Sequence, residues 1–322
     1  MTLTEQEVDQ FRRQGYVVKG GVYAASDLLP IKDSLTRIIQ HEASALQAKG
    51  ELDDLFEKEP FETRLAKIRF ADPDACEVIY RALMGRGGGG FHGPAMLEFL
   101  RHPPLLSCIE RLVGPEIIGS SVYRIRPKLP RWDHGEVPWH QDSGYLLAHC
   151  DSYLIVTCWI PLVDATLDNG CLHVLPGVHR GGILRHYTGG HAGYLEVPDG
   201  VLPEVTPVAL EMSAGDVLFM TNFTPHASFE NHSGQVRWSL DLRYQGTDAP
   251  NNVGEGPEDY TPEREPVTMA CYPPEADFVI RDDRHPEREI TSPEQFQDLR
   301  RRFDAGRAYS PGRGWTRLSE HG

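Results

Sequence analysis

The sequence predicts a mainly β fold, an antiparallel sandwich or jelly roll with flanking helices. From residue 117 to residue 247, short runs rich in β-branched and aromatic residues follow one another, separated by turn residues. No helical pattern comes between these runs, whereas a parallel sheet would need crossover helices there. The first hundred residues instead repeat apolar positions at helical spacing, which predicts the flanking helices.

The composition bounds the class of protein. With 322 residues, of which 40% are hydrophobic, the chain can bury a sizeable core. The formal net charge of −15 argues against a nucleic-acid partner and a polybasic membrane surface. No apolar run approaches the roughly 20 residues that span a bilayer, and the N-terminus has no apolar signal core. The six scattered cysteines indicate reduced thiols, so we expect a cytoplasmic protein without a membrane partner.

The N-terminal part, residues 1–115, is predicted to be mainly helical. Thr4 and Glu7 have the spacing of a capping box, and Gly15 is placed to end the helix that they begin. Segment 51–70 is charged and mixed, which indicates a helix with a loop. The other expected elements are a short strand within 16–23 and helices over 26–50 and 95–114, the last interrupted at Pro103 and Pro104.

The stretch GRGGGGFHG (85–93) cannot form regular structure, because four consecutive glycines carry too much backbone freedom. It is not a phosphate-binding loop, since no GK[ST] follows it. We predict a surface loop here, and a mobile lid beside a binding site is the alternative.

The β core is predicted over residues 116–247, and residues 248–322 add a loop region and a C-terminal helix to the same single domain, 1–322. The tetrapeptides LDNG (167–170) and SAGD (213–216) are predicted as hairpin-type turns. The expected strands lie within 117–129, 137–146, 153–165, 170–180, 216–229 and 236–245, and the C-terminal helix within 292–307.

His140 and Asp142 are two positions apart in a stretch, 137–146, that reads as a strand. Residues at this spacing in a strand face the same side, so both side chains can reach one point. His226, on a later strand, can supply a third ligand. Two imidazoles and one carboxylate on one face of a metal leave three positions open, as in non-haem Fe(II) oxygenases. The plainer alternative is a salt-linked pair of His140 and Asp142 with a structural role.

Arg237 follows His226 by eleven residues, just after a short loop. If the two lie on adjacent antiparallel strands, Arg237 can point into the same cavity. A guanidinium binds a carboxylate through two parallel, charge-assisted hydrogen bonds. It therefore suits the far carboxylate of 2-oxoglutarate, a keto acid that would chelate the metal and leave one position for dioxygen.

The sequence resembles the phytanoyl-CoA dioxygenase (PhyH-like) family of Fe(II)- and 2-oxoglutarate-dependent oxygenases. The resemblance covers most of the chain and rests on LTEQEVDQFRRQGYVV, WHQD, CWIPLVDATLDNGCLHVLPGVH, AGDVLFMTNFTPHAS and RWSLDLRY, in that order. It implies a double-stranded β-helix, or jelly-roll, core with flanking helices. It makes His140, Asp142 and His226 the iron ligands and Arg237 the anchor of 2-oxoglutarate.

The resemblance implies three further co-substrate residues. Ser228 would help to hold the carboxylate bound by Arg237, and Trp159 and Lys128 would line the same pocket. In the related halogenases a small residue stands where this chain has Asp142. The carboxylate fills the position that a halide would need, so hydroxylation or a kindred oxidation is favoured.

Tyr145, Tyr123 and Arg126 are candidate substrate residues. Tyr145 closely follows the ligand pair, whereas Tyr123, like Trp159, could line a pocket or simply pack. Arg124 and Arg126 share one strand face and could recognise an acidic group, with a plain surface position equally open. We expect the specificity loops within 51–92 and 247–290, the least family-like parts of the chain.

The predicted function is oxidation of an unactivated C–H bond of a small organic molecule, with Fe(II), 2-oxoglutarate and O₂. Hydroxylation in secondary-metabolite tailoring is the leading interpretation, and desaturation, epoxidation or cyclisation would use the same residues. Two other classes stay open. One is a cupin-like metalloenzyme without a keto acid, which would not need Arg237, and the other is a non-catalytic ligand-binding jelly roll. The sequence does not indicate the substrate or the oligomeric state.

Overall fold

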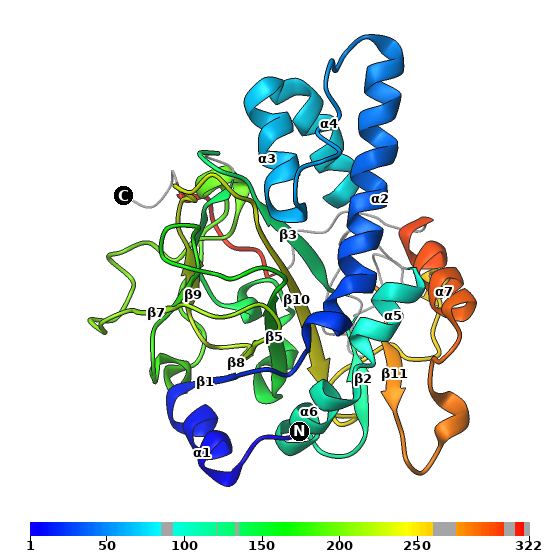
Figure 1. Ribbon diagram of the computed structural model, residues 1–322. Helices are drawn as coiled ribbons and strands as arrows, with labels where there is room; N and C mark the ends of the chain where they lie inside the picture. The colour runs from blue at the N-terminus through cyan, green and yellow to red at the C-terminus, as the bar shows by residue number, and fades with distance from the viewer. Residues whose placement is uncertain (85–92, 121, 133–134, 260–274, 306–312, 319–322) are drawn as a thin grey trace.

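Two antiparallel sheets form the core of the protein, and helices flank them (Figure 1). The structure is a computed structural model. The glycine run and parts of the predicted specificity loops lie outside the described residues. The described residues are 1–84, 93–120, 122–132, 135–259, 275–305 and 313–318.

The larger sheet has seven strands in the order β1-β8-β5-β10-β2-β11, and β3 pairs with β10 on the same edge as β2. The smaller sheet has the order β4-β9-β6-β7. All pairings between these described strands are antiparallel, as a jelly roll requires. The strands are β1 (Tyr16–Lys19), β2 (Ile117–Gly119), β3 (Arg124–Lys128), β4 (Val137–His140), β5 (Ile155–Pro161), β6 (Leu172–Val174), β7 (Val208–Leu210), β8 (Val217–Thr221), β9 (His226–Ser228), β10 (Arg237–Gln245) and β11 (Phe278–Arg281).

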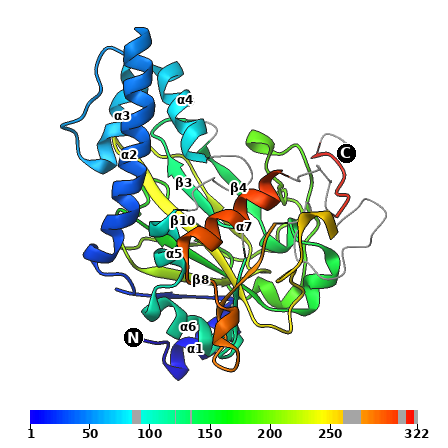
Figure 2. The same cartoon turned by 90° about the vertical axis from the view of Figure 1, so that its right-hand side faces the viewer.

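The helices gather on the outer side of the larger sheet. The longest, α2, stands along the molecule with α3 and α4 against its upper half, and α7 crosses the sheet beside α5 (Figures 1 and 2). Their buried apolar residues form one continuous core with the sheet. The helices are α1 (Glu5–Gln14), α2 (Ala25–Lys49), α3 (Phe61–Ala71), α4 (Pro73–Met84), α5 (Pro94–Leu100), α6 (Pro103–Val113) and α7 (Pro293–Ala305).

The start of the chain folds as its local sequence predicts. Thr4 and Glu7 form the capping box of α1, and Gly15 ends the helix in the left-handed conformation, with φ at 84°. Two strands from outside 116–247, β1 and β11, also join the larger sheet. More described residues lie in helices than in strands, so "mainly β" describes the core and not the whole chain.

The two predicted hairpin turns are tight turns but not hairpins. The turn at 167–170 follows β5 in the larger sheet and leads to β6 in the smaller one. The turn at 213–216 carries the chain back from β7 to β8. A jelly roll wraps the chain across both sheets, so consecutive strands here face each other instead of pairing.

The predicted strand over 137–146 is also shorter than expected. β4 ends at His140, and a single 3-10 turn, η2 (Asp142–Gly144), follows after one residue. The backbone N–H of Gly144 bonds to the carbonyl of Gln141, which closes this turn. The side chains of His140 and Asp142 therefore do not point the same way because of i, i+2 spacing in one strand, although they still reach the same cavity.

None of the helices in the described ranges combines the length and the apolar character needed to cross a bilayer. The five cysteines in those ranges are buried free thiols, as predicted; Cys271 lies outside them. Burial raises the pKa of Cys76 to about 12 and that of Cys150 to about 12, so these thiols stay protonated and act as small apolar side chains.

Candidate metal and co-substrate site

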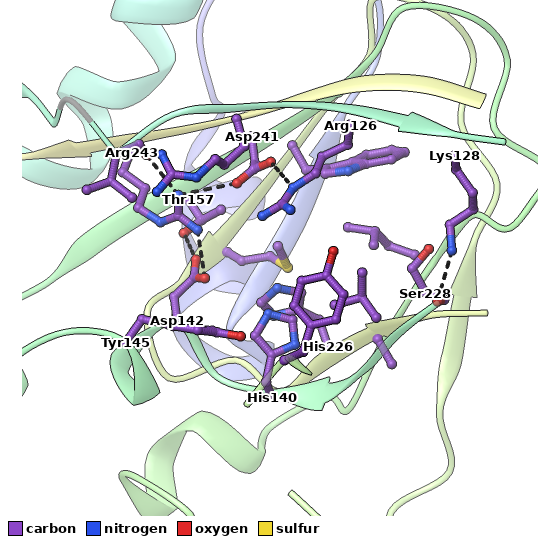
Figure 3. A pocket seen from close by; sticks show the side chains of 18 of the residues that line it. Arg126, Lys128, His140, Asp142, Tyr145, Thr157, His226, Ser228, Asp241 and Arg243 are labelled. Carbon is purple, nitrogen blue, oxygen red and sulfur yellow. Dashed lines mark hydrogen bonds and ion pairs between the residues drawn. The ribbon is translucent and has the colours of Figure 1, made fainter. Parts of the chain in front are cut away.

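A cavity of about 440 Å³ lies between the two sheets. One wall comes from β4 and β9 of the smaller sheet and carries His140, His226 and Ser228 (Figure 3). The facing wall comes from β3, β5 and β10 of the larger sheet and carries mostly charged side chains. The chemistry-bearing residues of separate strands therefore meet in one space.

The three predicted metal ligands come together in this cavity. One nitrogen or oxygen atom from each of His140, Asp142 and His226 lies within 4.8 Å of the other two. All three residues are buried, and the two imidazole rings are 4.2 Å apart between centroids. The carboxylate of Asp142 and two imidazoles are the donor set of a facial triad, so the residues fit a divalent metal such as Fe(II).

The hydrogen bonds of both histidines leave the correct nitrogen for a metal. Nδ1 of His140 lies 2.9 Å from the carbonyl oxygen of Pro138, and Nδ1 of His226 lies 3.0 Å from that of Thr224. A carbonyl can only accept, so each Nδ1 donates, and the lone pair for a metal is on Nε2. Burial, then His226, lowers the pKa of His140 to about 3, which keeps its imidazole neutral.

Asp142 is held as a carboxylate by two side chains from the facing sheet. Arg243 donates from Nη2 to one carboxylate oxygen at 2.8 Å, and the hydroxyl of Thr157 donates to the other. Burial acts to raise the pKa of Asp142, but Arg243 and the two histidines outweigh it and hold the pKa well below its usual range. Both carboxylate oxygens are thus fixed in position, which orients them for a metal.

Gln141, between the two ligands, points away from the cavity and locks this part of the backbone. Its backbone N–H donates to Nε2 of His186 at 2.9 Å, and its side-chain amide donates to the carbonyls of Gly182 and Phe223. The ring of His186 lies 5.4 Å from that of Trp315, tilted by 34°, and the indole N–H of Trp315 donates to the carbonyl of Gly144 in η2. The segment around Trp315 therefore braces the short turn that carries Asp142.

Arg237 and His226 do not lie on adjacent strands, contrary to the prediction. β9 belongs to the smaller sheet and β10 to the larger one, and Arg237 reaches the cavity from the opposite wall. Its Nη2 lies 3.5 Å from the hydroxyl oxygen of Ser228, across the gap between the sheets. The cavity is shared as predicted, but the residues face each other because the fold separates consecutive strands into two sheets.

Arg237 is a buried cation with no carboxylate partner among the residues that the structure describes. Its side chain is 2% exposed, its Nη1 donates to Ser239, and its Nε is without a hydrogen-bond acceptor. The guanidinium lies 5.1 Å from the ring centre of Trp159. Burial lowers the pKa of Arg237 to about 10. A buried cation of this kind is costly unless an anion accompanies it, so the position suits a carboxylate ligand.

Lys128 lines the same cavity, but its Nζ is already surrounded by acceptors. It donates to the backbone carbonyls of Ser228 at 3.1 Å and Phe229 at 2.6 Å, and also to that of Gly135. Three carbonyl acceptors match the three donors of an ammonium group. Its direct contact with a co-substrate therefore stays a prediction. Burial, and then the neighbouring charge of Arg237, lower the pKa of Lys128 to about 6.

Of the three candidate substrate residues, two line the cavity and one does not. Tyr145 and Arg126 are part of its wall. Tyr123 is instead fully buried on the other side of the sheet, stacked against Phe296 with Arg300 over its ring at 4.8 Å. The period-two alternation that turns Arg124 and Arg126 inward turns Tyr123 outward into the helical layer.

Comparisons with known proteins show the family to which this chain belongs. The profile of the family described as "Phytanoyl-CoA dioxygenase (PhyH)" matches residues 11–239 and thus contains the triad and Arg237. The chain belongs to the phytanoyl-CoA dioxygenase family. A phytanoyl-CoA dioxygenase domain-containing protein 1 homolog of Dictyostelium discoideum is 32% identical over 262 residues, 76% of this chain and 92% of that protein. Phytanoyl-CoA dioxygenase 1 of Oryza sativa subsp. japonica is 25% identical over 77% of this chain and 90% of its own length. The match to an Arabidopsis thaliana relative, at 34% identity, spans only 40% of that protein.

Solved structures show the same fold at low sequence identity. The epimerase SnoN from nogalamycin biosynthesis is similar with a TM-score of 0.51 and 18% identity, and covers 86% of this chain and 98% of its own. The non-heme monooxygenase ThoJ is similar with a TM-score of 0.53 and 17% identity, over 92% of this chain and 96% of its own. The predicted jelly-roll core with flanking helices is therefore confirmed. Fe(II) and 2-oxoglutarate, the cofactors expected of a phytanoyl-CoA dioxygenase relative, agree with the donor set of the triad.

Sequence reasoning missed four residues that shape the site. Arg243 and Asp241 share the inward face of β10 with Arg237, so the alternation within RWSLDLRY was a usable signal. Thr157 likewise shares the face of Trp159 on β5. His186 lies in an irregular segment with no periodicity, so no pattern in the sequence pointed to it.

Proposed function

We propose that this phytanoyl-CoA dioxygenase family member is a non-haem Fe(II)- and 2-oxoglutarate-dependent dioxygenase that oxidises an unactivated C–H bond of a small organic molecule. One observation carries the proposal. The His140, Asp142 and His226 ligand atoms meet on one side of a cavity, and a buried Arg237 without a carboxylate partner in the described chain faces them.

Each of these residues has a role in the proposal. His140, Asp142 and His226 hold Fe(II), and Arg237 with Ser228 holds the far carboxylate of 2-oxoglutarate. When bound, the iron supplies, with 2-oxoglutarate and dioxygen, the oxidising power that a C–H bond requires.

The protein's own contribution is positioning and exclusion of water. Arg243 and Thr157 fix both oxygens of Asp142, so that the ligand does not rotate during turnover. Trp159, Leu172 and Met220 give the cavity an apolar wall near the triad. A dry and rigid pocket limits side reactions and strengthens the charge interactions within it.

Hydroxylation in secondary-metabolite tailoring is the proposed outcome. Desaturation, epoxidation or cyclisation would use the same residues, and one protein of the same fold is named as an α-ketoglutarate-dependent epimerase. A cytoplasmic location stays a prediction.

The two other function classes are less well supported. A cupin-like metalloenzyme without a keto acid would not explain the buried Arg237, whose Nε lacks an acceptor in the described chain. A non-catalytic jelly roll would not explain why Arg243 and Thr157 hold both carboxylate oxygens of Asp142. The charged wall of the cavity therefore favours the oxygenase.

Two substitutions test the proposal. Asp142→Ala should abolish Fe(II)-dependent conversion of 2-oxoglutarate to succinate and lower iron binding, because the only carboxylate of the triad is lost. Arg237→Gln should raise the 2-oxoglutarate concentration needed for half-maximal succinate formation by about 10- to 100-fold, the effect of losing charge-assisted hydrogen bonds. It should leave iron binding unchanged, since Arg237 does not contact the triad.

Succinate assays and iron titrations on both variants measure these effects. Succinate formation by Asp142→Ala at the rate of the unmodified enzyme would refute the ligand assignment. An unchanged 2-oxoglutarate requirement in Arg237→Gln would show that Arg237 does not anchor the co-substrate. The absence of succinate formation by the unmodified, iron-loaded protein would instead favour the metalloenzyme that does not use a keto acid.

A further inference from the structure

Arg126 presents hydrogen-bond donors to the cavity that the proposed chemistry does not use. It lies on β3, on the wall opposite the histidines and between Asp241 and Lys128 (Figure 3). Its Nε donates to Asp241 at 3.0 Å, which fixes the guanidinium plane. Within the described ranges no acceptor is bonded to its two Nη atoms, and its side chain is 31% exposed toward the cavity. The outer edge of a fixed guanidinium is therefore open to a ligand.

The ion pairs around Arg126 that the described residues form join four guanidiniums to three carboxylates, in a chain whose net charge is −15. Arg126 and Arg243 share the carboxylate of Asp241, at 3.0 and 3.3 Å. Glu275 is shared in the same way by two guanidiniums, at 3.5 and 3.8 Å. The third carboxylate, that of Asp142, is the proposed iron ligand, so its negative charge would also be shared with the metal. We call these ion-paired groups the basic cluster. Its guanidiniums are those of Arg124, Arg126, Arg243 and Arg300, and its carboxylates are those of Asp142, Asp241 and Glu275.

Arg126 is the member of the basic cluster that is best placed for a ligand. Nη atoms of Arg243 already contact Asp142, Asp241 and the carbonyl of Val122. Arg124 uses its Nη1 on the carbonyl of Tyr123 and its Nη2 on Glu275. Among the described residues, Arg126 is held through Nε alone, so the fork formed by its two Nη atoms keeps the geometry that binds an oxyanion with two bonds.

Three tyrosines on the cavity wall surround this end of the pocket: Tyr80, Tyr145 and Tyr194. The hydroxyl oxygen of Tyr145 accepts a hydrogen bond from the backbone N–H of Leu195 at 3.0 Å, which leaves its O–H free to donate. Burial raises the pKa of Tyr80 to about 12, against the opposing effect of Arg126. Phenol hydroxyls are hydrogen-bond donors, and the rings offer apolar surface. A ligand bound here would therefore have an anionic group and an apolar, preferably aromatic, body.

We infer that Arg126 is the recognition site for a carboxylate or phosphate group on the primary substrate, which is thus a small organic anion with an apolar body. The inference rests on the proposed function, because it assumes that Arg237 takes 2-oxoglutarate. The substrate's anionic group lies at Arg126, and its apolar part extends over the triad, where the C–H bond to be oxidised is held.

Binding measurements on inert complexes test this inference. The protein is loaded with Zn(II) and saturated with N-oxalylglycine, an unreactive analogue that fills the 2-oxoglutarate site. Hydrocinnamate, phenethyl phosphate and the neutral hydrocinnamamide are then titrated by calorimetry. We expect the better of the two anions to bind at least about 10-fold more tightly than the amide, since only an anion gains the charge-assisted pair. Which anion binds better identifies the group as carboxylate or phosphate.

Arg126→Gln should weaken binding of that anion by about 10- to 100-fold and leave amide binding unchanged. Asp241 keeps Arg243 as its partner in this variant. Arg126→Lys keeps the charge but loses the fork, and should bind the anion more weakly than the unmodified protein even if the glutamine variant does not fold. Arg281→Gln is the matched control, because Arg281 also lies on a strand, is 23% exposed and pairs with a carboxylate at 2.8 Å, but is outside the cavity.

Three results would overturn the inference. The first is equal binding of anion and amide, and the second is unchanged anion binding in both Arg126 variants. The third is a loss of N-oxalylglycine binding in Arg126→Gln that is as large as its loss of anion binding, which would make Arg126 a co-substrate residue. If N-oxalylglycine does not bind the unmodified protein, the proposed function fails instead. The anion titration is then repeated on metal-free Arg237→Gln protein, where Arg126 is still intact.

Discussion

Arg243 joins the two walls of the cavity through one guanidinium. It contacts Asp142 on the smaller-sheet side of the site and Asp241 on its own strand. Its side chain is only 10% exposed, so water screens these interactions little. The orientation of the carboxylate ligand therefore depends on a residue that does not itself reach the metal.

Arg243→Gln should lower the affinity of the protein for a divalent metal by about 10- to 100-fold, the usual effect of removing a partner that orients a ligand. Zn(II) titration measures it, and Thr157→Val, which removes the other partner of Asp142 at nearly constant volume, should act in the same direction. Arg281→Gln serves again as the control. A rise in affinity would show that repulsion between the guanidinium and the metal outweighs orientation, and would contradict this account of Arg243.

At the scale of elements, α1 is tied to the strand that carries His226. Thr224 donates from its hydroxyl to the carbonyl of Gly15 at 2.6 Å, and its own carbonyl receives Nδ1 of His226. His179 also packs here, with its Nε2 at 3.2 Å from the carbonyl oxygen of Arg12. The end of the first helix therefore supports the position of a proposed metal ligand more than 200 residues later.

Gly15→Ala should destabilise the protein by clearly more than about 1 kcal/mol. The left-handed backbone alone costs a β-carbon roughly 1–2 kcal/mol. A Cβ here would also lie 2.5 Å from Nδ1 of His179 and 2.7 Å from Oγ1 of Thr224. Gly21→Ala is the matched control, because Gly21 has a φ of 64° and a Cβ there would have no atom within 4 Å. Urea unfolding of both variants measures the difference, and equal losses would show that the close approach at Gly15 is harmless.

At the scale of the whole molecule, two buried neutral histidines make the stability of the metal-free protein depend on pH. Burial lowers the pKa of His140 to about 3 and that of His186 to about 4. In the unfolded chain both titrate near 6.5, so between these values the unfolded state binds more protons. The free energy of unfolding is therefore unaffected by these groups above about pH 6.5 and falls as the pH drops below it.

Urea unfolding of the metal-free protein at several pH values measures this dependence. The unfolding midpoint should fall between about pH 6.5 and about pH 4.5, and less steeply in His186→Asn, whose side chain can still accept from Gln141 but does not titrate. His149→Gln, at an exposed position, should behave as the unmodified protein. A midpoint that does not change over this range would show that the two histidines are not buried as neutral groups.

Some features of the whole molecule could be predicted from the sequence, and others could not. Helix boundaries such as Thr4 with Gly15 were predictable, because caps act through bonds between residues close in the chain. The ligand set was predictable from the types and order of His140, Asp142 and His226. The path of the chain between the sheets was not, so the sequence predicts hairpins at 167–170 and 213–216 where the chain instead passes from one sheet to the other. A tight turn has the same local sequence whether the next strand pairs with the last or faces it.

The sequence by itself determined the chemistry that the site can offer: the donor set of the proposed metal site, a guanidinium suited to the proposed co-substrate, and a β core with helices before it. Only the tertiary structure decided the geometry. It put Asp142 on a 3-10 turn, turned Tyr123 out of the cavity, and set Arg237 on the wall opposite His226. It also gave Asp142 its partners Arg243 and Thr157. Donor types are properties of single residues, whereas convergence depends on contacts between strands far apart in the chain, which no local pattern encodes.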